Sequence, residues 1–486
     1  MNYLQVLQLA APETALAITV LMVLAVDLIA LRGESIARRF RTGAMVSILG
    51  CLMAAIFSFT HYGQTDPLHG LLVVDPLTNF LKVVLLILTI FTVMISTSGK
   101  FTEHVGEYLA LVLLATIGLM FLVSAEDILM IFISLELASL SLYILTAFNK
   151  RNARSSEAAL KYFLFGGMSA AFLLFGFSLL YGLSGSTNLP QIAANVAGKE
   201  MDPLLLVAIV TTVIGFGFKV AAVPFHLWAP DAYEGAPTLS AAFIASGSKV
   251  ASFYILAKIM TMGFAGAEGS AVWHGYVSGW TPVIAVVAAL SMVLGNLTAI
   301  VQSSVKRLLA YSAIAHAGYM LLGVLANTPS SRSALLFYVI TYALTVLGAF
   351  GVVTVVEAAT GGDAISNFAG LSRRAPGLSL CLLVFLLSLA GIPPLAGFIG
   401  KFFLFSAVVG TDAEHLGLLW LVILAILMSA VSFYYYLQVL KQAYVLDAAE
   451  NAPAIKVPSV TMLALVLLAV LVVLLGCAPG LLLSHL

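Results

Sequence analysis

Three lysines and one glutamate lie deep inside apolar stretches of the sequence: Glu136, Lys219, Lys249 and Lys401. Glu136 and Lys249 lie about 15 and 17 Å from the starts of their runs, near the middle of a bilayer core. A charge at that depth costs about 2.5–3.5 kcal/mol on insertion scales, so such residues are functional candidates. A carboxylate that approaches and leaves a lysine in a dry site can load and release a proton. The chemistry that this set predicts is proton transfer.

Two histidines extend the set. His226 follows Lys219 by seven residues, about two helical turns, so we expect both side chains on one side if the helix bends only modestly. His316 lies near mid-depth in its own run, between Tyr311 and Tyr319. A neutral imidazole accepts a hydrogen bond on one nitrogen and donates from the other, as a proton relay requires. The alternative is a purely structural hydrogen bond, and without a second His at ligand spacing we expect no metal.

Prolines interrupt two of the runs that carry these lysines. Pro224 follows Lys219, and Pro393 with Pro394 precedes Lys401. Proline removes a helical N–H and clashes with the preceding turn, so we expect broken helices at both places. The carbonyls freed there, at Val220 before the first break and at 389 and 390 before the second, must be satisfied by water or by neighbouring side chains.

Composition indicates an all-α polytopic membrane protein: 62% of residues are hydrophobic, 9% are charged, and the mean hydropathy is +1.09. Apolar runs long enough to cross a bilayer predict about 14 transmembrane helices. They lie near 11–31, 42–61, 76–97, 105–124, 126–148, 157–184, 203–228, 238–260, 276–300, 304–326, 333–359, 376–409, 415–446 and 458–484.

The basic residues of the loops predict the orientation. One set of alternate loops carries Arg32, Arg38, Arg39, Arg41, Lys100, Lys150, Arg151, Arg154, Lys306, Arg307, Arg373, Arg374, Lys441 and Lys456. The other set carries only Lys199 and Arg332. By the positive-inside rule both termini lie outside. The N-terminus has no basic region ahead of its apolar run, so we expect a first span and not a removed signal.

Charges nearer the ends of the runs have simpler interpretations. Asp27, Lys82 and Lys258 are expected to reach the membrane surface by snorkelling. A separate pair, Glu157 and Lys161, is spaced to neutralise itself along one helix face.

Other features of the sequence limit the chemistry that the chain itself could perform. The acidic stretch with Asp231 and Glu234 is expected to be a solvated loop. Cys51, Cys381 and Cys477 are isolated in apolar runs and are expected to be buried structural thiols. No nucleotide-binding motif occurs, so redox or ATP chemistry is assigned to partners.

Two broken helices, the seventh and the twelfth, lie five positions apart in the helix order and predict two inverted five-helix repeats. The predicted division is residues 1–104 (three helices), 105–265 (helices 4–8), 266–448 (helices 9–13) and 449–486 (helix 14).

Four stretches closely resemble the subunit N family, the antiporter-like membrane subunits of bacterial respiratory complex I (NADH:quinone oxidoreductase): FKVAAVPFHLWAPDAYEGAPT, LELASLSLYILTAF, EAALKYF and KRLLAYSAIAHAGYMLLG. The resemblance covers essentially the whole chain. It implies proton translocation along Glu136, Lys219, Lys249 and Lys401, with His226 and His316 as relays.

The resemblance also implies the surroundings of the chain. The implied location is the bacterial cell inner membrane, with both termini on the periplasmic side. The implied partners are the antiporter-like subunit M, the small subunits K and J, and the lateral helix of subunit L. No cofactor is expected in this chain; NADH, FMN, iron–sulfur clusters and quinone are implied in partner subunits. Two alternatives stay open: an Mrp-type sodium/proton antiporter subunit and a non-conducting structural subunit.

Overall fold

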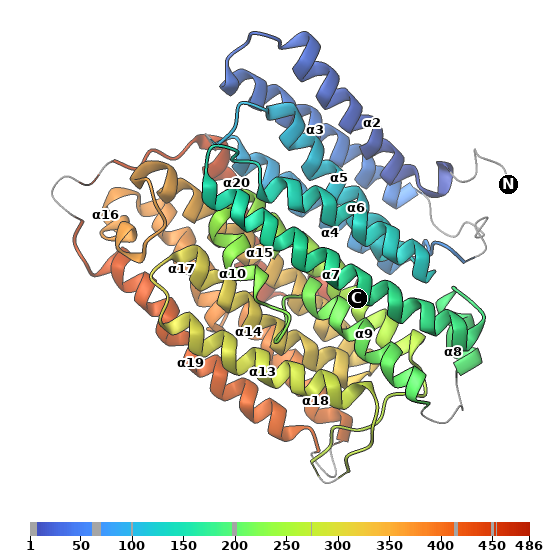
Figure 1. Ribbon diagram of the computed structural model, residues 1–486. Coiled ribbons are helices and arrows are strands. Elements are labelled where there is room, and N and C mark those ends of the chain that lie inside the picture. Colours follow the sequence, from blue (N-terminus) through green and yellow to red (C-terminus); the bar gives the residue numbers. More distant parts are fainter. Residues whose placement is uncertain are drawn as a thin grey trace.

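The chain folds as a bundle of antiparallel helices lying side by side, with α2 and α3 at one edge and α13 and α19 at the opposite edge (Figure 1). The computed structural model describes residues 7–60, 70–98, 101–196, 202–273, 275–412, 417–448, 452 and 454–486. Lys100 and Lys199, which entered the orientation argument, lie outside these residues. The described part contains helices and isolated β-bridges but no strand.

Twelve stretches of the described chain are long and apolar enough to cross a membrane as the sequence predicted. In helix terms they are α2 (Ala11–Ala25) with η1 (Val26–Ala30), α3 (Ile36–Thr60), α4 (Pro76–Ser96), α5 (Val105–Ser124), α6 (Ile128–Thr146), α7 (Ala153–Ser184), α11 (Thr238–Ala245) with α12 (Gly247–Lys258) and η2 (Ile259–Gly263), α13 (Trp280–Ile300), α14 (Val305–Ala326), α15 (Pro329–Thr360), α19 (Leu419–Tyr444) and α20 (Ser459–Cys477). Shorter connecting helices are α8 (Leu189–Val196), η3 (Ile365–Phe368), α16 (Leu371–Arg374), η4 (Gly410–Asp412) and α21 (Gly480–Leu483).

The seventh and twelfth spans are broken, which confirms the proline argument. The seventh consists of α9 (Pro203–Lys219) and α10 (Trp228–Gly235), and the twelfth of α17 (Pro376–Ala390) and α18 (Ala396–Val409). In the first break Ala221 has φ of 57°, a left-handed conformation that costs a non-glycine residue about 1–3 kcal/mol. The break is thus built into the packed structure. Counting the two broken spans, the described residues provide the expected 14 candidate spans.

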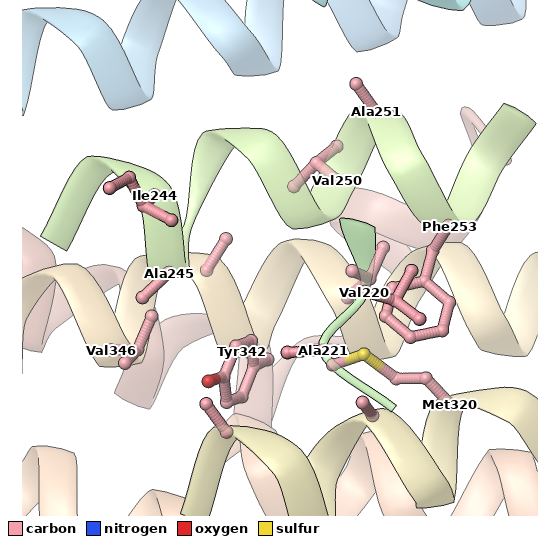
Figure 2. Close-up of a cluster of buried hydrophobic side chains, with 14 of the residues drawn as sticks. Val220, Ala221, Ile244, Ala245, Val250, Ala251, Phe253, Met320, Tyr342 and Val346 are labelled. Carbon is pink, nitrogen blue, oxygen red and sulfur yellow. The ribbon is translucent and has the colours of Figure 1, made fainter. Parts of the chain in front are cut away.

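A third interruption, in the eighth span, was not predicted from the sequence. Ser246 leaves helical geometry and separates α11 from α12. Figure 2 shows Ile244 and Ala245 on α11 and Val250 and Ala251 on α12, packed over the core. No proline marks this place, so only the small residues around it gave any signal. Lys249 lies directly after the interruption.

The most buried helix is α15, all of whose apolar window is covered by other parts of the chain. It packs against α11, α14, α17, α18 and α20. Loops such as 31–35, 147–152 and 361–375 lie at one end of the bundle, which we call the basic end (Figure 1). β-Bridges between Leu72 and Ala125 and between Asp127 and Asn188 tie loops at the opposite end.

The prediction that Asp27 and Lys82 reach the membrane surface by snorkelling is wrong. Lys82 is 2% exposed, with its Nζ 2.8 Å from Oε1 of the equally buried Glu13. Asp27 accepts from Arg39 and from the backbone of Gly106. Both expectations failed because the partner lies on another helix, at a separation that sequence spacing does not reveal.

The predictions for Lys258 and for one of the cysteines are also wrong. Lys258 is 9% exposed, with its Nζ 3.3 Å from Glu126, so it is paired inside the protein. Cys51 and Cys381 are buried as expected, but Cys477 is exposed on the outer face of α20.

Candidate functional site

Glu136 and Lys219 come together between α6 and α9. The Lys219 Nζ donates to Ser139 Oγ at 2.5 Å and lies 3.8 Å from Glu136 Oε1. The lysine side chain is 6% exposed and the glutamate 26%, so the carboxylate borders the lateral surface of the chain. At this distance the ion pair is at the outer limit of contact, and small helix movements can make or break it.

Lys249 lies at the beginning of α12, where the Ser246 interruption aims it at the centre of the bundle. Its Nζ donates to the Ala313 carbonyl of α14 at 2.5 Å and lies 5.4 Å from the ring centre of Tyr342 on α15. It forms no ion pair with any described carboxylate. Ala313 lies one turn before His316 on the same helix, so Lys249 and His316 are neighbours.

His316 is buried between Lys249 and Lys401. Its Nδ1 lies 2.7 Å from the Tyr338 hydroxyl, and its Nε2 lies 3.3 Å from the Tyr436 hydroxyl. Its ring is 4.9 Å from that of Tyr342, the ring that Lys249 also contacts, and 5.6 Å from that of Tyr319. Both imidazole nitrogens therefore have a hydroxyl partner, as a relay requires.

Lys401 reaches back from α18 across the second break. Its Nζ donates to the carbonyls of Leu389 and Ala390 at 3.0 and 3.1 Å and to Ser429 Oγ at 2.8 Å. It also lies 5.2 Å from the ring centre of Tyr319, which His316 contacts. The expectation that side chains would satisfy the carbonyls freed at this break is confirmed. A largely apolar cleft of 840 Å³ between α18 and α19 leads to Lys401.

His226 is not brought to Lys219 by helical spacing. Residues 220–227 leave the helix, so seven residues do not correspond to two turns. The Nδ1 of His226 is buried without a hydrogen-bond partner among the described residues. Two backbone groups at this break bind other side chains. The Val223 N–H donates to Ser291 Oγ at 2.9 Å, and the Phe218 carbonyl accepts from Trp228 Nε1 at 3.0 Å.

The acidic stretch at the basic end is helical and ion-paired, which corrects the prediction of a solvated loop. Asp231, on α10, accepts from Lys161 of α7 and from Arg307 of α14, each at 2.8 Å. Arg307 also binds Glu234 at 2.9 Å, and Lys161 keeps its predicted pairing with Glu157 at 2.7 Å.

Sequence reasoning missed the tyrosines Tyr338 and Tyr436, which bind His316. Both lie in apolar helices, and nothing in the neighbouring sequence indicates a functional role. A buried tyrosine cannot be distinguished from a core-packing residue until the partner of its hydroxyl is known. The described part of the chain contains no cluster of three His, Cys, Asp or Glu side chains that could hold a metal ion.

The arrangement is a row of buried proton-binding groups in a bundle with two broken helices, as in membrane antiporter-like proteins. The chain belongs to the NADH:quinone oxidoreductase/Mrp antiporter membrane family, whose model matches residues 125–432. Within it, the chain is 55% identical over its whole length to the NADH-quinone oxidoreductase subunit N 2 of Acidobacterium capsulatum, covering 99% of that protein.

Solved structures agree with this assignment. A chain of the respiratory complex I of Thermus thermophilus is 33% identical, with 97% of this chain and 98% of that chain covered and a TM-score of 0.78. A chain of an archaeal membrane-bound sulfane sulfur reductase is 26% identical, with 98% and 96% covered and a TM-score of 0.84.

Proposed function

We propose that this chain is a proton-translocating membrane-arm subunit of an NADH:quinone oxidoreductase, driven by quinone reduction elsewhere in the complex. The observation that carries the proposal is the set of deep ionisable groups, namely the Glu136–Lys219 pair, and Lys249 and Lys401 on either side of His316. The full-length relative named subunit N supports the type of complex.

In this proposal Glu136 and Lys219 form the loading pair. Approach of the carboxylate favours the charged lysine, and separation in the dry site favours release of the proton. Lys249, His316 and Lys401 carry the proton onward, because carbonyl and hydroxyl oxygens hold these lysines without fixing their charge by a counter-ion. His226 remains a proposed relay at the first break, where its unpartnered Nδ1 needs a hydrogen-bonding neighbour such as water.

The chain would contribute to the enzyme as a translocase subunit, with NADH, FMN, iron–sulfur clusters and quinone held by partner subunits. The proposed neighbours are subunit M, the small subunits K and J, and the lateral helix of subunit L. The proposed setting is the bacterial inner membrane with both termini periplasmic, supported by the asymmetry of basic loops. The proposed division into helices 1–3, 4–8, 9–13 and 14 follows the positions of the two breaks.

The family also contains Mrp antiporters, so a sodium/proton antiporter subunit is the second candidate. The 55% identity over the whole chain to a protein named NADH-quinone oxidoreductase subunit N 2 favours the oxidoreductase subunit. Altered sodium uptake with normal NADH oxidation after deletion of the gene would favour the antiporter.

The test is Glu136→Gln in the assembled complex, with protons translocated per NADH oxidised as the readout. The amide keeps the size of the side chain but cannot pair electrostatically with Lys219, so pumping should fall while assembly persists. Glu34→Gln, at a carboxylate that is 39% exposed, is the matched control and should pump normally. Normal pumping by Glu136→Gln would refute the loading role.

A further inference from the structure

A sharp boundary between exposed and dry side chains crosses α7 and α10 near the basic end. The side chains of Glu157, Lys161 and Asp231 are 64%, 41% and 30% exposed. They line a pocket of 160 Å³ at this end of the bundle. The next residue on α7, Tyr162, is only 3% exposed, and Trp228, one turn before Asp231 on α10, is 2% exposed. Access from the basic end therefore stops at these two rings.

The two rings belong to a continuous aromatic layer. Tyr162 and Trp228 stack face to face, with centres 4.2 Å apart and planes inclined by 7°. Phe218 packs 5.0 Å from Trp228 and 6.0 Å from Tyr162, and Tyr143 meets Tyr162 edge-on at 4.6 Å. The N–H of Trp228 is occupied by the Phe218 carbonyl. The Trp228 N–H is therefore not free to bind water, whereas the Tyr143 hydroxyl has no hydrogen-bond partner among the described residues.

The far side of the layer touches the loading pair. The Lys219 Nζ lies 5.6 Å from the ring centre of Phe218 and 5.8 Å from that of Tyr143. Tyr143 is on α6, two turns beyond Glu136 toward the basic end. A chain of ring contacts therefore leads from Tyr162 and Trp228 to Phe218 and Tyr143, and from these two rings to Lys219.

Three ion pairs hold α10, the helix that carries Trp228. Trp228 is on α10, the short helix after the first break, which packs against α7 and α14. Asp231 binds Lys161 of α7 and Arg307 of α14, and Glu234 adds a second contact to Arg307. Because α10 is only eight residues long and follows a non-helical segment, these contacts fix its position.

We propose that the stacked rings of Tyr162, Trp228 and Phe218 are a gate between the basic end and the Glu136–Lys219 pair, and that Asp231 is a positioning residue that keeps this gate closed. The proposal rests on the proposed function for the meaning of the path, but the barrier itself is a property of the packing. Displacement of α10 would separate Trp228 from Tyr162 and admit water to Lys219.

The test measures access directly, by labelling a cysteine behind the gate. Ser139→Cys is introduced into the complete complex in which Cys51, Cys381 and Cys477 are serines, and a membrane-impermeant methanethiosulfonate is added to vesicles of either orientation. Trp228→Ala should accelerate labelling about tenfold or more from the basic side only, because several ring contacts are lost together. Phe175→Ala, at a ring that is 52% exposed on α7, should leave the rate unchanged.

Asp231→Asn is the gentler variant. It keeps the shape of the side chain but weakens both ion pairs, so labelling should accelerate from the same side, whereas Asp231→Glu should restore much of the slow rate. NADH oxidation by the same vesicles reports assembly. If Trp228→Ala does not assemble, the Asp231→Asn rate decides the question.

Equal labelling of the parent and both variants, or acceleration from the opposite side, would overturn the gate. Because labelling needs no pumping, accelerated labelling together with normal pumping by Glu136→Gln would keep the gate and reject only the proposed function.

Discussion

At the scale of single residues, the buried lysines differ in what neutralises them. Only Lys219 among the three deep lysines has a described carboxylate within ion-pair distance. Lys249 and Lys401 are held by backbone carbonyls and a serine hydroxyl, which accept from the ammonium without adding a charge. A fixed ion pair would hold the proton, so this arrangement suits transfer better than storage.

The tyrosines around His316 provide a matched pair of variants. Tyr338→Phe removes the hydroxyl at His316 Nδ1 and leaves a buried nitrogen unsatisfied, at a cost of about 1–3 kcal/mol. Proton transfer should slow by about tenfold. Tyr342→Phe, on the same helix and equally buried, removes a hydroxyl that has no partner among the described residues and should pump normally. Equal pumping by both variants would show that His316 is not a relay.

The sequence identified Lys219, Lys249 and Lys401 as deep lysines and Glu136 as a deep carboxylate, because an ionisable residue inside an apolar run is visible without a structure. It did not identify Tyr338 or Glu13, since their roles depend on contacts between distant helices. The seven-residue spacing of His226 from Lys219 did not predict how their side chains are placed, because helical periodicity stops at Val220.

At the scale of elements, the second break depends on a close approach between α17 and α18. A Cβ at Gly397 would lie 1.9 Å from the Ser388 carbonyl oxygen. Gly397→Ala should therefore displace α18 and with it Lys401, costing about 1–3 kcal/mol and depressing the proton yield per NADH.

The control for this change is Gly167→Ala on α7, where an added Cβ meets nothing within 4 Å. It should be neutral or stabilise by up to about 1 kcal/mol, because alanine favours a helix over glycine. Heat inactivation of NADH oxidation and proton yield measure both variants. Normal pumping by Gly397→Ala would mean that the position of Lys401 does not require this contact.

The ion pair between α2 and α4 lies outside the residues that the family model matches. Lys82→Met leaves the Glu13 carboxylate buried and unpaired, so the subunit should lose about 3–5 kcal/mol of stability. The double variant Glu13→Gln with Lys82→Met should recover most of it. Retention of the subunit in the complex on heating is the measurement, and a double variant as unstable as Lys82→Met would argue against the pairing.

At the scale of the whole molecule, the chain is a helix bundle in which Lys219, Lys249 and Lys401 are buried beside the two broken spans and the interrupted eighth span. Composition and proline positions predicted the class, the 14 crossings and both broken helices. They could not predict the interruption at Ser246, because no residue there forbids a helix, and the packing of α11 and α12 against α15 imposes it. That interruption places Lys249 beside His316.

The central claim is that the buried groups carry protons, and Lys401→Arg tests it most directly. Arginine keeps the charge but does not release its proton in proteins, and the 840 Å³ cleft beside Lys401 leaves room for the larger group. Lys441→Arg, at an exposed position on α19, is the control for the same substitution. The complex with Lys401→Arg should assemble but translocate fewer protons per NADH than the Lys441→Arg control. A full proton yield from Lys401→Arg would show that Lys401 is a fixed charge and would contradict the account.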